Sequence, residues 1–272
     1  MIEPVVIRAR AKINLLLDVL GKRADGYHEL RMIMQTLELH DTLTLRPAAP
    51  GSISLVCSDK SLPADEANLA YKAAKLLMER YDTGGVSIRL EKRIPVAAGL
   101  AGGSADCAAA LIGVNQMFGL GLTQSELIKI GAELGADVPF CIVGGICLAE
   151  GAGERLTRLP PRPPMPVLLV KPDFPVSTAE VFAAFDAEGH VFSDNSDCAV
   201  MRNALESVTE ARFPIIKDIK ALLLAGGADC AMMTGSGPTV FACFADTRRA
   251  EAAAASARRE YPSAEIILTA TD

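Results

Sequence analysis

Hydrophobic and polar residues alternate along the first part of the chain. Between positions 5 and 19 one side carries Ile7, Ala9, Ala11, Ile13 and Leu15, and the other carries Arg8, Arg10, Lys12 and Asn14. A period of two is that of a half-buried β-strand. The turn sequence Arg-Ala-Asp-Gly at 23–26 and the apolar-rich segment at 29–45 predict that the chain returns as a second extended segment. We therefore expect the protein to open with a β-hairpin.

The pattern beyond residue 50 predicts a mixture of helices and strands on both sides of a proline-rich stretch. Up to that stretch we expect strands at 53–57 and 86–94 and helices at 68–80, 104–118 and 125–134. After it we expect strands at 167–172 and 265–270, a strand, glycine turn and strand at 230–244, and helices at 178–187, 197–209, 214–226 and 248–260. Proline denies the stretch PPRPPMP (160–166) ladder hydrogen bonds, so it is interpreted as a linker between domains at 1–160 and 161–272.

Composition narrows the class of protein. Half of the 272 residues are hydrophobic and 22% are charged, as in folded globular proteins. The net charge of −6 argues against a nucleic-acid partner, because phosphate neutralisation needs a basic surface. The apolar run 138–149 is too short to span a bilayer, so no membrane partner is expected. Seven cysteines without a C-x-x-C pair indicate reduced, mostly buried thiols and a cytoplasmic protein.

The stretch IPVAAGLAGGSADCAAA (94–110) is a glycine-rich loop that leads into a helix. Backbone N–H groups and the positive end of the helix dipole converge at such a place, which favours an anion. The loop has no Walker lysine and does not fit G-x-G-x-x-G, so a tightly packed turn is an equal alternative. Ser104 is a candidate for the helix N-cap or for a ligand to a phosphate-bound metal.

Two further features combine a charged group with a specific position. Lys12 and Asn14 share one face of the first strand, where they present a cation and an amide; a solvated face, with Arg8 beside them, is the plainer interpretation. Asp137, in GADVPF (135–140), stands between a helix and an apolar run. It is a candidate for a helix cap or for a base in a cleft of low dielectric.

Three other features have both a structural and a functional interpretation. The turn MTGSGPTVF (233–241) places Thr234 and Ser236 where they can donate to phosphate, although a hairpin turn explains its glycines equally well. Tyr27 and His28 can stack on a flat ring, but a lone histidine is more often structural. The histidines and cysteines show no metal-ligand spacing, so we expect no protein metal site.

The order of these motifs resembles that of the GHMP kinases. The resemblance is carried by AKINL (11–15), PVAAGLAGGSADCAAAL (95–111) and MTGSGPTVF (233–241). Within that superfamily, KRADGYHEL (22–30), LGADVPF (134–140) and VSTAEVF (176–182) are similar to the subfamily that phosphorylates 4-diphosphocytidyl-2-C-methyl-D-erythritol on its 2-hydroxyl with ATP, in the non-mevalonate isoprenoid pathway. The resemblance implies a two-domain α+β fold, with an N-terminal domain of the ribosomal protein S5 domain 2-like type and a ferredoxin-like C-terminal domain.

The resemblance also implies a role for each matching residue. Lys12 and Asp137 look like the catalytic pair. The implied ATP-binding residues are Asn68, Lys92, Pro95, Gly99, Leu100, Ala101, Gly102, Gly103 and Ser104. The implied residues for the cytidyl substrate are Asn14, Tyr27, His28, Thr178 and Phe182. ATP and Mg²⁺ are the implied cofactors, a small molecule the partner, and a monomer or homodimer the assembly.

Two departures and two alternatives accompany this hypothesis. Relatives often carry Asn-Asp-x-Glu where this chain has Ser196-Asp197-Cys198-Ala199, and many have glycine at the position of Ala101. Homoserine, mevalonate and galactose kinases share the three motifs, so a different acceptor is the nearest alternative. A noncatalytic nucleotide- or RNA-binding module of the same fold is the second.

Overall fold

The computed structural model describes residues 3–24, 26–187 and 201–272 and divides the chain into two compact units. Unit 1 comprises residues 1–11, 39–96 and 101–144, and unit 2 comprises residues 12–38, 97–100 and 145–272. The two long strands of the N-terminal hairpin, β1 (Val5–Lys22) and β2 (His28–Ala48), contribute to both units. The predicted hairpin is confirmed, and both strands are longer than expected.

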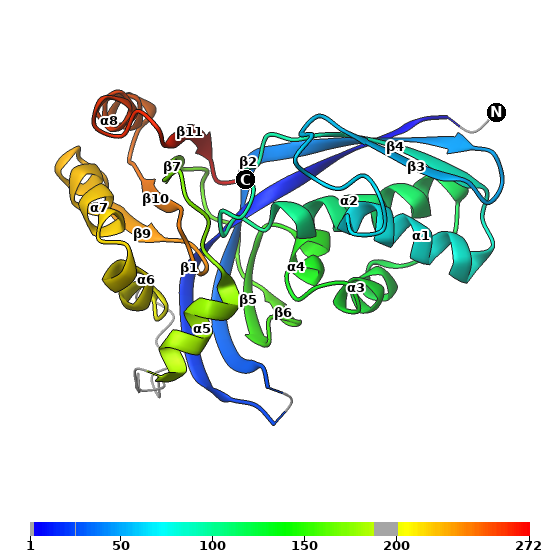
Figure 1. The fold of residues 1–272 in the computed structure, drawn as a ribbon, viewed down its shortest axis with the longest axis horizontal. Coiled ribbons are helices and arrows are strands. Elements are labelled where there is room, and N and C mark those ends of the chain that lie inside the picture. The colour runs from blue at the N-terminus through cyan, green and yellow to red at the C-terminus, as the bar shows by residue number, and fades with distance from the viewer. Residues whose placement is uncertain (1–2, 25, 188–200) are drawn as a thin grey trace. The chain divides into compact units, whose positions relative to one another are not determined.

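Unit 1 places four helices beside a small sheet (Figure 1). Strand β4 (Gly85–Glu91) pairs in parallel with β3 (Ile53–Cys57) and antiparallel with the second half of β2. The helices are α1 (Leu69–Tyr81), α2 (Gly102–Phe118), α3 (Gln124–Ala132) and α4 (Val138–Val143). Thr123 caps α3 in a capping box with Glu126. The alanine-rich α2 packs closely, since a Cβ on Gly113 would lie 2.5 Å from Leu45.

Unit 2 holds the hairpin ends and a second sheet. Strand β2 pairs with β5 (Ile146–Gly151), β5 with β6 (Arg155–Arg158), and β1 in parallel with β8 (Arg202–Asn203). The second sheet is antiparallel, in the order β11 (Glu265–Ala270), β7 (Pro166–Lys171), β10 (Val240–Cys243) and β9 (Cys230–Met233). Numbered within this domain, that is order 4-1-3-2, which confirms the predicted ferredoxin-like arrangement.

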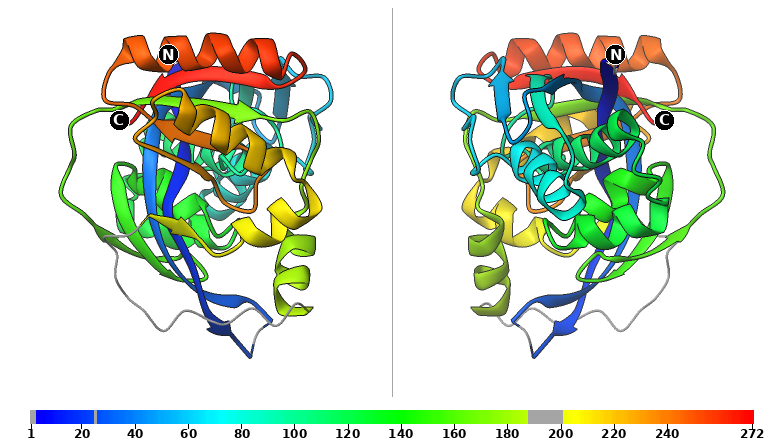
Figure 2. Two further views of the ribbon diagram at one scale, coloured as in Figure 1. Left: turned by 90° about the vertical axis from the view of Figure 1, so that its left-hand side faces the viewer. Right: turned by 90° about the vertical axis from the view of Figure 1, so that its right-hand side faces the viewer.

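Helices complete unit 2. They are α5 (Thr178–Ala187), α6 (Glu206–Arg212), α7 (Ile215–Ala225) and α8 (Thr247–Glu260). Helix α8 precedes β11 in the chain and packs on it (Figure 2), with Ala250, Ala253, Ala254 and Ala257 buried. The apolar side of α7 packs on β9 and β10.

Some sequence predictions need correction. Among the described residues of the helix predicted at 197–209, Arg202 and Asn203 form β8, and α6 begins only at Glu206, because pairing with β1 overrides the local preference. Helix α4 and strand β5, which share the apolar run 138–149, were not predicted; Gly144 and Gly145, both with positive φ, separate them. Strand β6 was not predicted, since its four residues are short and mostly exposed.

Candidate active site

Lys12 and Asn14 form a buried pair on β1. Their exposed fractions are 4% and 0%, and Lys12 Nζ donates a hydrogen bond of 2.7 Å to Asn14 Oδ1. The same face is exposed at Arg8, so the solvated-face interpretation holds only at the start of the strand. A buried ammonium needs polar partners, and the amide two positions along supplies one. The period-two prediction that these side chains point the same way is confirmed.

Segments from all three motifs meet at Thr234. The Asn14 N–H donates to Thr234 Oγ1 over 3.1 Å, and that hydroxyl lies 3.4 Å from both Asn14 Oδ1 and Gly99 O. Gly99 has φ +73°, and a Cβ there would lie 2.4 Å from Thr234 O, so only glycine fits this approach. The Lys12 N–H also donates to Leu100 O over 3.1 Å. The glycine loop is therefore fixed to both the first strand and the third motif.

The continuation of the loop forms an uncapped helix N-terminus. Ala101 is the N-cap of α2, with φ +57° and no side-chain capping bond. Ser104 lies inside the first turn, so the expectation that it caps this helix is wrong. A first turn without a side-chain cap leaves N–H donors for an anion. The left-handed backbone at Ala101 explains why glycine is common there, since alanine pays about 1–2 kcal/mol for it.

Lys92 lies in a buried cluster with two acids. Its ammonium bonds Asp41 Oδ2 and, over 2.8 Å, Asp106 Oδ2, and these side chains are 8%, 0% and 5% exposed. Burial and the charge of Asp41 raise the pKa of Asp106 to about 7, although Lys92 acts to lower it. Burial acts to lower the pKa of Lys92, but the two carboxylates outweigh it and raise that pKa. A Cβ on Gly102 would lie 3.4 Å from Lys92 Nζ, so this charge lies against the start of α2.

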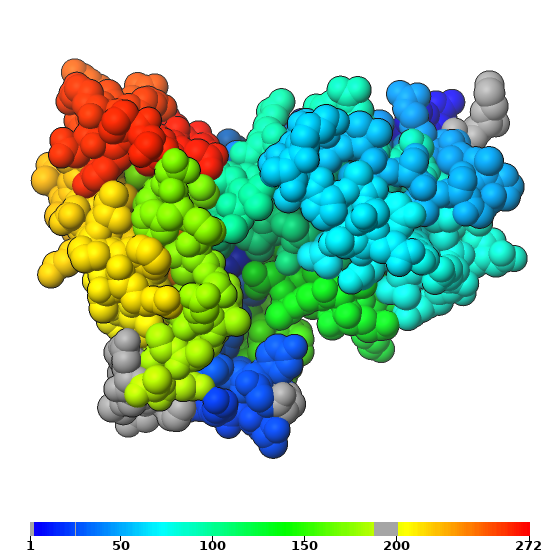
Figure 3. Space-filling model, in the orientation of Figure 1, coloured from blue at the N-terminus to red at the C-terminus, as the bar shows by residue number. Residues whose placement is uncertain are grey.

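His28 is held by two partners from α5. Its ring stacks on Phe182 with centroids 4.5 Å apart, and its Nε2 lies 2.8 Å from Asp186 Oδ1. Hydrogen bonds from Lys22 and His28 lower the pKa of Asp186. Figure 3 shows the surface of α5 directly against the blue end of the hairpin. Tyr27 is 64% exposed beside this cluster.

The remaining predicted residues lie at loops and helix ends. Asp137 is the N-cap residue of α4, yet its side chain makes no capping bond, so the cap interpretation fails for the carboxylate. Asn68 caps α1 by accepting from Ala70 N over 3.0 Å. Pro95 is buried in the loop after β4, and Thr178 Oγ1 lies 2.7 Å from Ser236 Oγ. Lys12 belongs to unit 2 and Asp137 to unit 1, and their pairing stays a prediction.

Two family models and several known proteins match the chain. Residues 68–145 match the model of the GHMP kinase N-terminal domain, and residues 191–263 match that of the GHMP kinase C-terminal domain. The 4-diphosphocytidyl-2-C-methyl-D-erythritol kinase of Pelotomaculum thermopropionicum is 50% identical, over 97% of this chain and 96% of its own. The chain belongs to this family of GHMP kinases. A crystal structure of 4-(cytidine 5'-diphospho)-2C-methyl-D-erythritol kinase superposes with a TM-score of 0.84 at 33% identity, covering 98% of this chain and 100% of the other.

A more distant GHMP kinase shares the fold alone. The homoserine kinase of Cytophaga hutchinsonii gives a TM-score of 0.77 at 17% identity, over 100% of this chain and 95% of its own. The superfamily and the family expected from the motifs are confirmed by the two family models and by the 50% identical relative.

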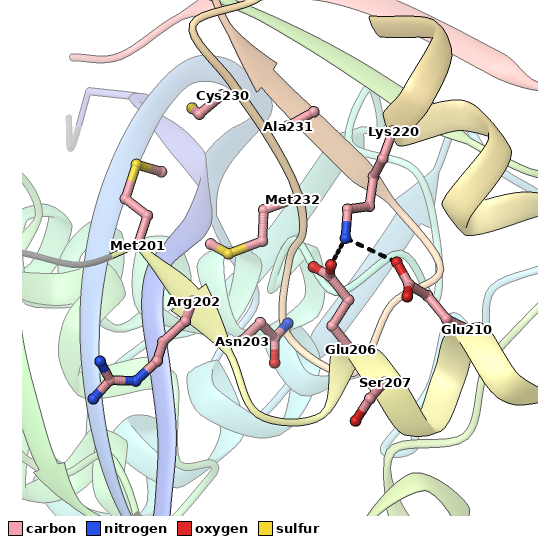
Figure 4. A pocket seen from close by; sticks show the side chains of 10 residues that line it. All are labelled: Met201, Arg202, Asn203, Glu206, Ser207, Glu210, Lys220, Cys230, Ala231 and Met232. Carbon is pink, nitrogen blue, oxygen red and sulfur yellow. Dashed lines mark hydrogen bonds and ion pairs between the residues drawn. The ribbon is translucent and has the colours of Figure 1, made fainter. Parts of the chain in front are cut away.

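Sequence reasoning missed two residues of this kinase that contact the third motif. Asn203 Nδ2 donates to Met233 O and Gly235 O, both over 2.8 Å, and Glu206 Oε2 accepts from Met233 N over 2.8 Å. The side chains of Asn203 and Glu206 are labelled in Figure 4. They stand in Asn203-Ala204-Leu205-Glu206, an Asn-x-x-Glu sequence. The segment 196–199, where the departure from that pattern was placed, lies outside the described residues. Asn203 and Glu206 stand seven residues after positions 196 and 199 and have the same spacing. That spacing was the signal that could have found them.

The described part of the kinase offers no preformed metal cage. No group of three or more His, Cys, Asp or Glu side chains gathers within residues 3–24, 26–187 and 201–272. The six cysteines in those ranges are free thiols, four of them buried. None of the described helices is long and apolar enough to cross a membrane.

Proposed function

We propose that this kinase transfers the γ-phosphoryl group of ATP to the 2-hydroxyl of 4-diphosphocytidyl-2-C-methyl-D-erythritol. The observation that carries the proposal is the meeting of Asn14, Gly99 and Thr234, which joins the three motifs through hydrogen bonds in one place. The near full-length identity of 50% to a kinase of that name supports the acceptor.

The ATP phosphates would bind at the glycine loop and the first turn of α2. The donor set fits them, because Ala101 makes no side-chain cap and Gly102 and Gly103 bring backbone N–H groups without a Cβ. Lys92 is held against this turn, and Asn68, at the start of α1 in the same unit, would lie with it near the adenine. Pro95 and Leu100 would shape the loop.

Mg²⁺ would enter with the nucleotide. Mg²⁺ is commonly held by one or two protein oxygens, waters and substrate phosphates, which suits a chain with no cluster of three ligands among its described residues. When bound it would neutralise charge on the phosphates. The Ser104 hydroxyl, in the first turn of α2, is the protein oxygen we propose for it.

Lys12 and Asp137 would carry the chemistry. Asp137 would accept the proton of the 2-hydroxyl as it attacks the γ-phosphorus, a contribution on the order of 10²–10⁴-fold. Lys12 would hold that oxygen and stabilise the ionised acid. Two observations support these roles: Asp137 does not use its carboxylate as a cap, and Lys12 is buried and oriented by Asn14. Asn14 is itself fully buried. We propose two roles for it: it orients Lys12, and it contacts the cytidyl part.

The cytidyl part would bind at the end of the hairpin. His28 would hydrogen-bond the base, with its ring fixed by Phe182 and Asp186, and the exposed Tyr27 would cover a ring face. Thr178, at the first turn of α5, would contact the same substrate.

An acceptor panel tests the function. Purified protein is incubated with ATP and Mg²⁺ and with the cytidyl substrate, homoserine, mevalonate or galactose, and phosphorylated product is measured. We expect product only with the cytidyl substrate. Product with another acceptor would replace the substrate assignment, and ATP binding without transfer to any acceptor would favour a noncatalytic module.

The domain division and the setting of the protein complete the proposal. Domains at 1–160 and 161–272 agree with the ranges of the two family models, each of which lies within one of them. We propose a cytoplasmic enzyme that acts as a monomer or homodimer on a small molecule and binds no nucleic acid, the last in keeping with its net charge of −6.

A further inference from the structure

Asn203 and Glu206 both contact the glycine turn of the third motif, residues 233–239. We infer that they are positioning residues, which hold this turn so that Thr234 can bond Asn14. The inference rests on the proposed function, because it gives these contacts a role in phosphoryl transfer. Neither side chain is among the residues that the three motifs contain.

Asn203 holds the turn on both sides of Thr234. Its Nδ2 donates to the carbonyl before Thr234 and to the carbonyl after it, both over 2.8 Å. Its Oδ1 accepts from Leu205 N over 3.0 Å, and the residue is 8% exposed. Three of the amide's four hydrogen-bonding positions are therefore used, and the carbonyls of Met233 and Gly235, the two neighbours of Thr234, are held by one rigid group.

Glu206 also bonds Met233, the residue before Thr234. Its Oε2 accepts from Met233 N over 2.8 Å, so both backbone groups of Met233 are bonded by side chains from β8 and α6. Thr209 Oγ1, one turn further along α6, lies 3.3 Å from Ser236 O. A turn with two left-handed glycines, Gly235 and Gly237, has many alternative conformations, and these bonds select one.

A path of hydrogen bonds connects this support to the catalytic lysine. The held turn carries Thr234, whose hydroxyl accepts from Asn14 N, and Asn14 Oδ1 accepts from Lys12 Nζ. The residues of this path all belong to unit 2. Loss of the support is therefore expected to disturb the position of Lys12, although neither Asn203 nor Glu206 contacts it in the bonds described.

Lys220 pairs with both Glu206 and Glu210, so Glu210 provides a matched control for Glu206. Its ammonium pairs with Glu206 and, over 2.8 Å, with Glu210, and these acids are 13% and 21% exposed. The three side chains line a cavity of about 400 Å³ (Figure 4). Both acids are therefore partners of one lysine in one cavity, but only Glu206 bonds the turn.

The test compares Glu206→Ala, Glu206→Gln and Glu210→Ala with the wild type. Steady-state kcat and KM are measured with ATP and the cytidyl substrate, at a temperature where circular dichroism shows each variant folded. We expect kcat of Glu206→Ala to fall by about tenfold or more, because a misplaced catalytic group costs up to about 100-fold. Glu206→Gln, which keeps the acceptor oxygen, should recover most of it, and Glu210→Ala should stay within about twofold of wild type.

Equal kcat values for Glu206→Ala and Glu210→Ala would overturn the inference, as would a glutamine variant no better than the alanine variant. Should Glu206→Ala fail to fold, Asn203→Asp provides the second variant: it keeps the shape and the bond to Leu205 but sets an anion against two carbonyl oxygens. Its kcat is expected to fall at least as far, and wild-type kcat would overturn the inference.

Amide hydrogen exchange separates this inference from the proposed function. Exchange over residues 233–239, without substrate, should be faster in Glu206→Ala than in Glu210→Ala. A wild type that is inactive on the cytidyl substrate would refute the proposed function alone. Equal exchange in the two variants would refute the role of Glu206 whatever the substrate.

Discussion

Replacing Thr234 with valine removes the hydroxyl at which the three motifs meet and changes little else in shape. Thr234 is fully buried, and its Oγ1 accepts from Asn14 N over 3.1 Å. Valine leaves that N–H buried without a partner, which costs about 1–3 kcal/mol. The added methyl group returns about 0.8 kcal/mol of apolar burial. The expected net loss of unfolding free energy is therefore about 0.2–2 kcal/mol.

Thr239 supplies the matched control in the same turn. It too is fully buried, and its Oγ1 has no hydrogen-bond partner among the described residues. Thr239→Val removes a hydroxyl that bonds nothing there, so its free energy of unfolding should be unchanged or raised. Thr234→Ser keeps the hydroxyl and should retain most of the bond.

Urea unfolding followed by circular dichroism measures these differences, and thermal scans should show Tm lowered by up to about 8 °C for Thr234→Val. The activity of the folded variant should fall as well, because Asn14 orients Lys12. Equal destabilisation by Thr234→Val and Thr239→Val would refute the reasoning, since burial alone would then explain both.

Three further predictions concern other parts of the site. The pKa of Asp106, about 7 against an ordinary 3.8, means that the folded state keeps a proton which the unfolded chain releases, so the stability from this group is present below about pH 4 and lost as the pH rises through 7. In wild type the free energy of unfolding should therefore fall by up to about 4 kcal/mol between pH 4 and pH 8.5, and in Asp106→Asn this fall should be absent. Urea unfolding measures both, and an unchanged pH dependence in the variant would contradict the prediction. Gly99→Ala places a Cβ 2.4 Å from a backbone oxygen and should abolish folding or activity. Gly119→Ala, also at positive φ but in open space, should lower the free energy of unfolding by only about 1–2 kcal/mol. Equal effects of the two substitutions in denaturant and activity assays would contradict the close approach at Gly99. Asp186→Asn removes the carboxylate beside His28 and should raise KM for the cytidyl substrate about three- to tenfold with kcat retained, while an unchanged KM would show that this contact does not prepare the base site.

Local patterns predicted most elements because they depend on neighbouring residues. The alternation in β1, the return of the chain as β2 and the limits of β3 and α5 could all be inferred from short stretches. Strand β8 could not, because its two residues pair with β1, far away in the sequence, and a two-residue strand has no period of its own.

The candidate site divides in the same way. The glycine loops and Lys12 stand in motifs, so their positions followed from the sequence. Their supports did not: Lys92 pairs with Asp41 and His28 with Asp186 across long separations, and no local spacing marks either acid. Only the final fold brings such partners together, so the sequence indicated candidate residues and not the side chains that hold them.

The most direct test of the central claim is the rate of transfer of labelled γ-phosphoryl from ATP to the cytidyl substrate by the wild type and by Asp137→Asn, both at saturating substrates. If Asp137 is the base paired with Lys12, the wild type forms labelled product and the variant is slower by about 10²–10⁴-fold with substrate binding largely kept. Equal rate constants for the two proteins would contradict the account.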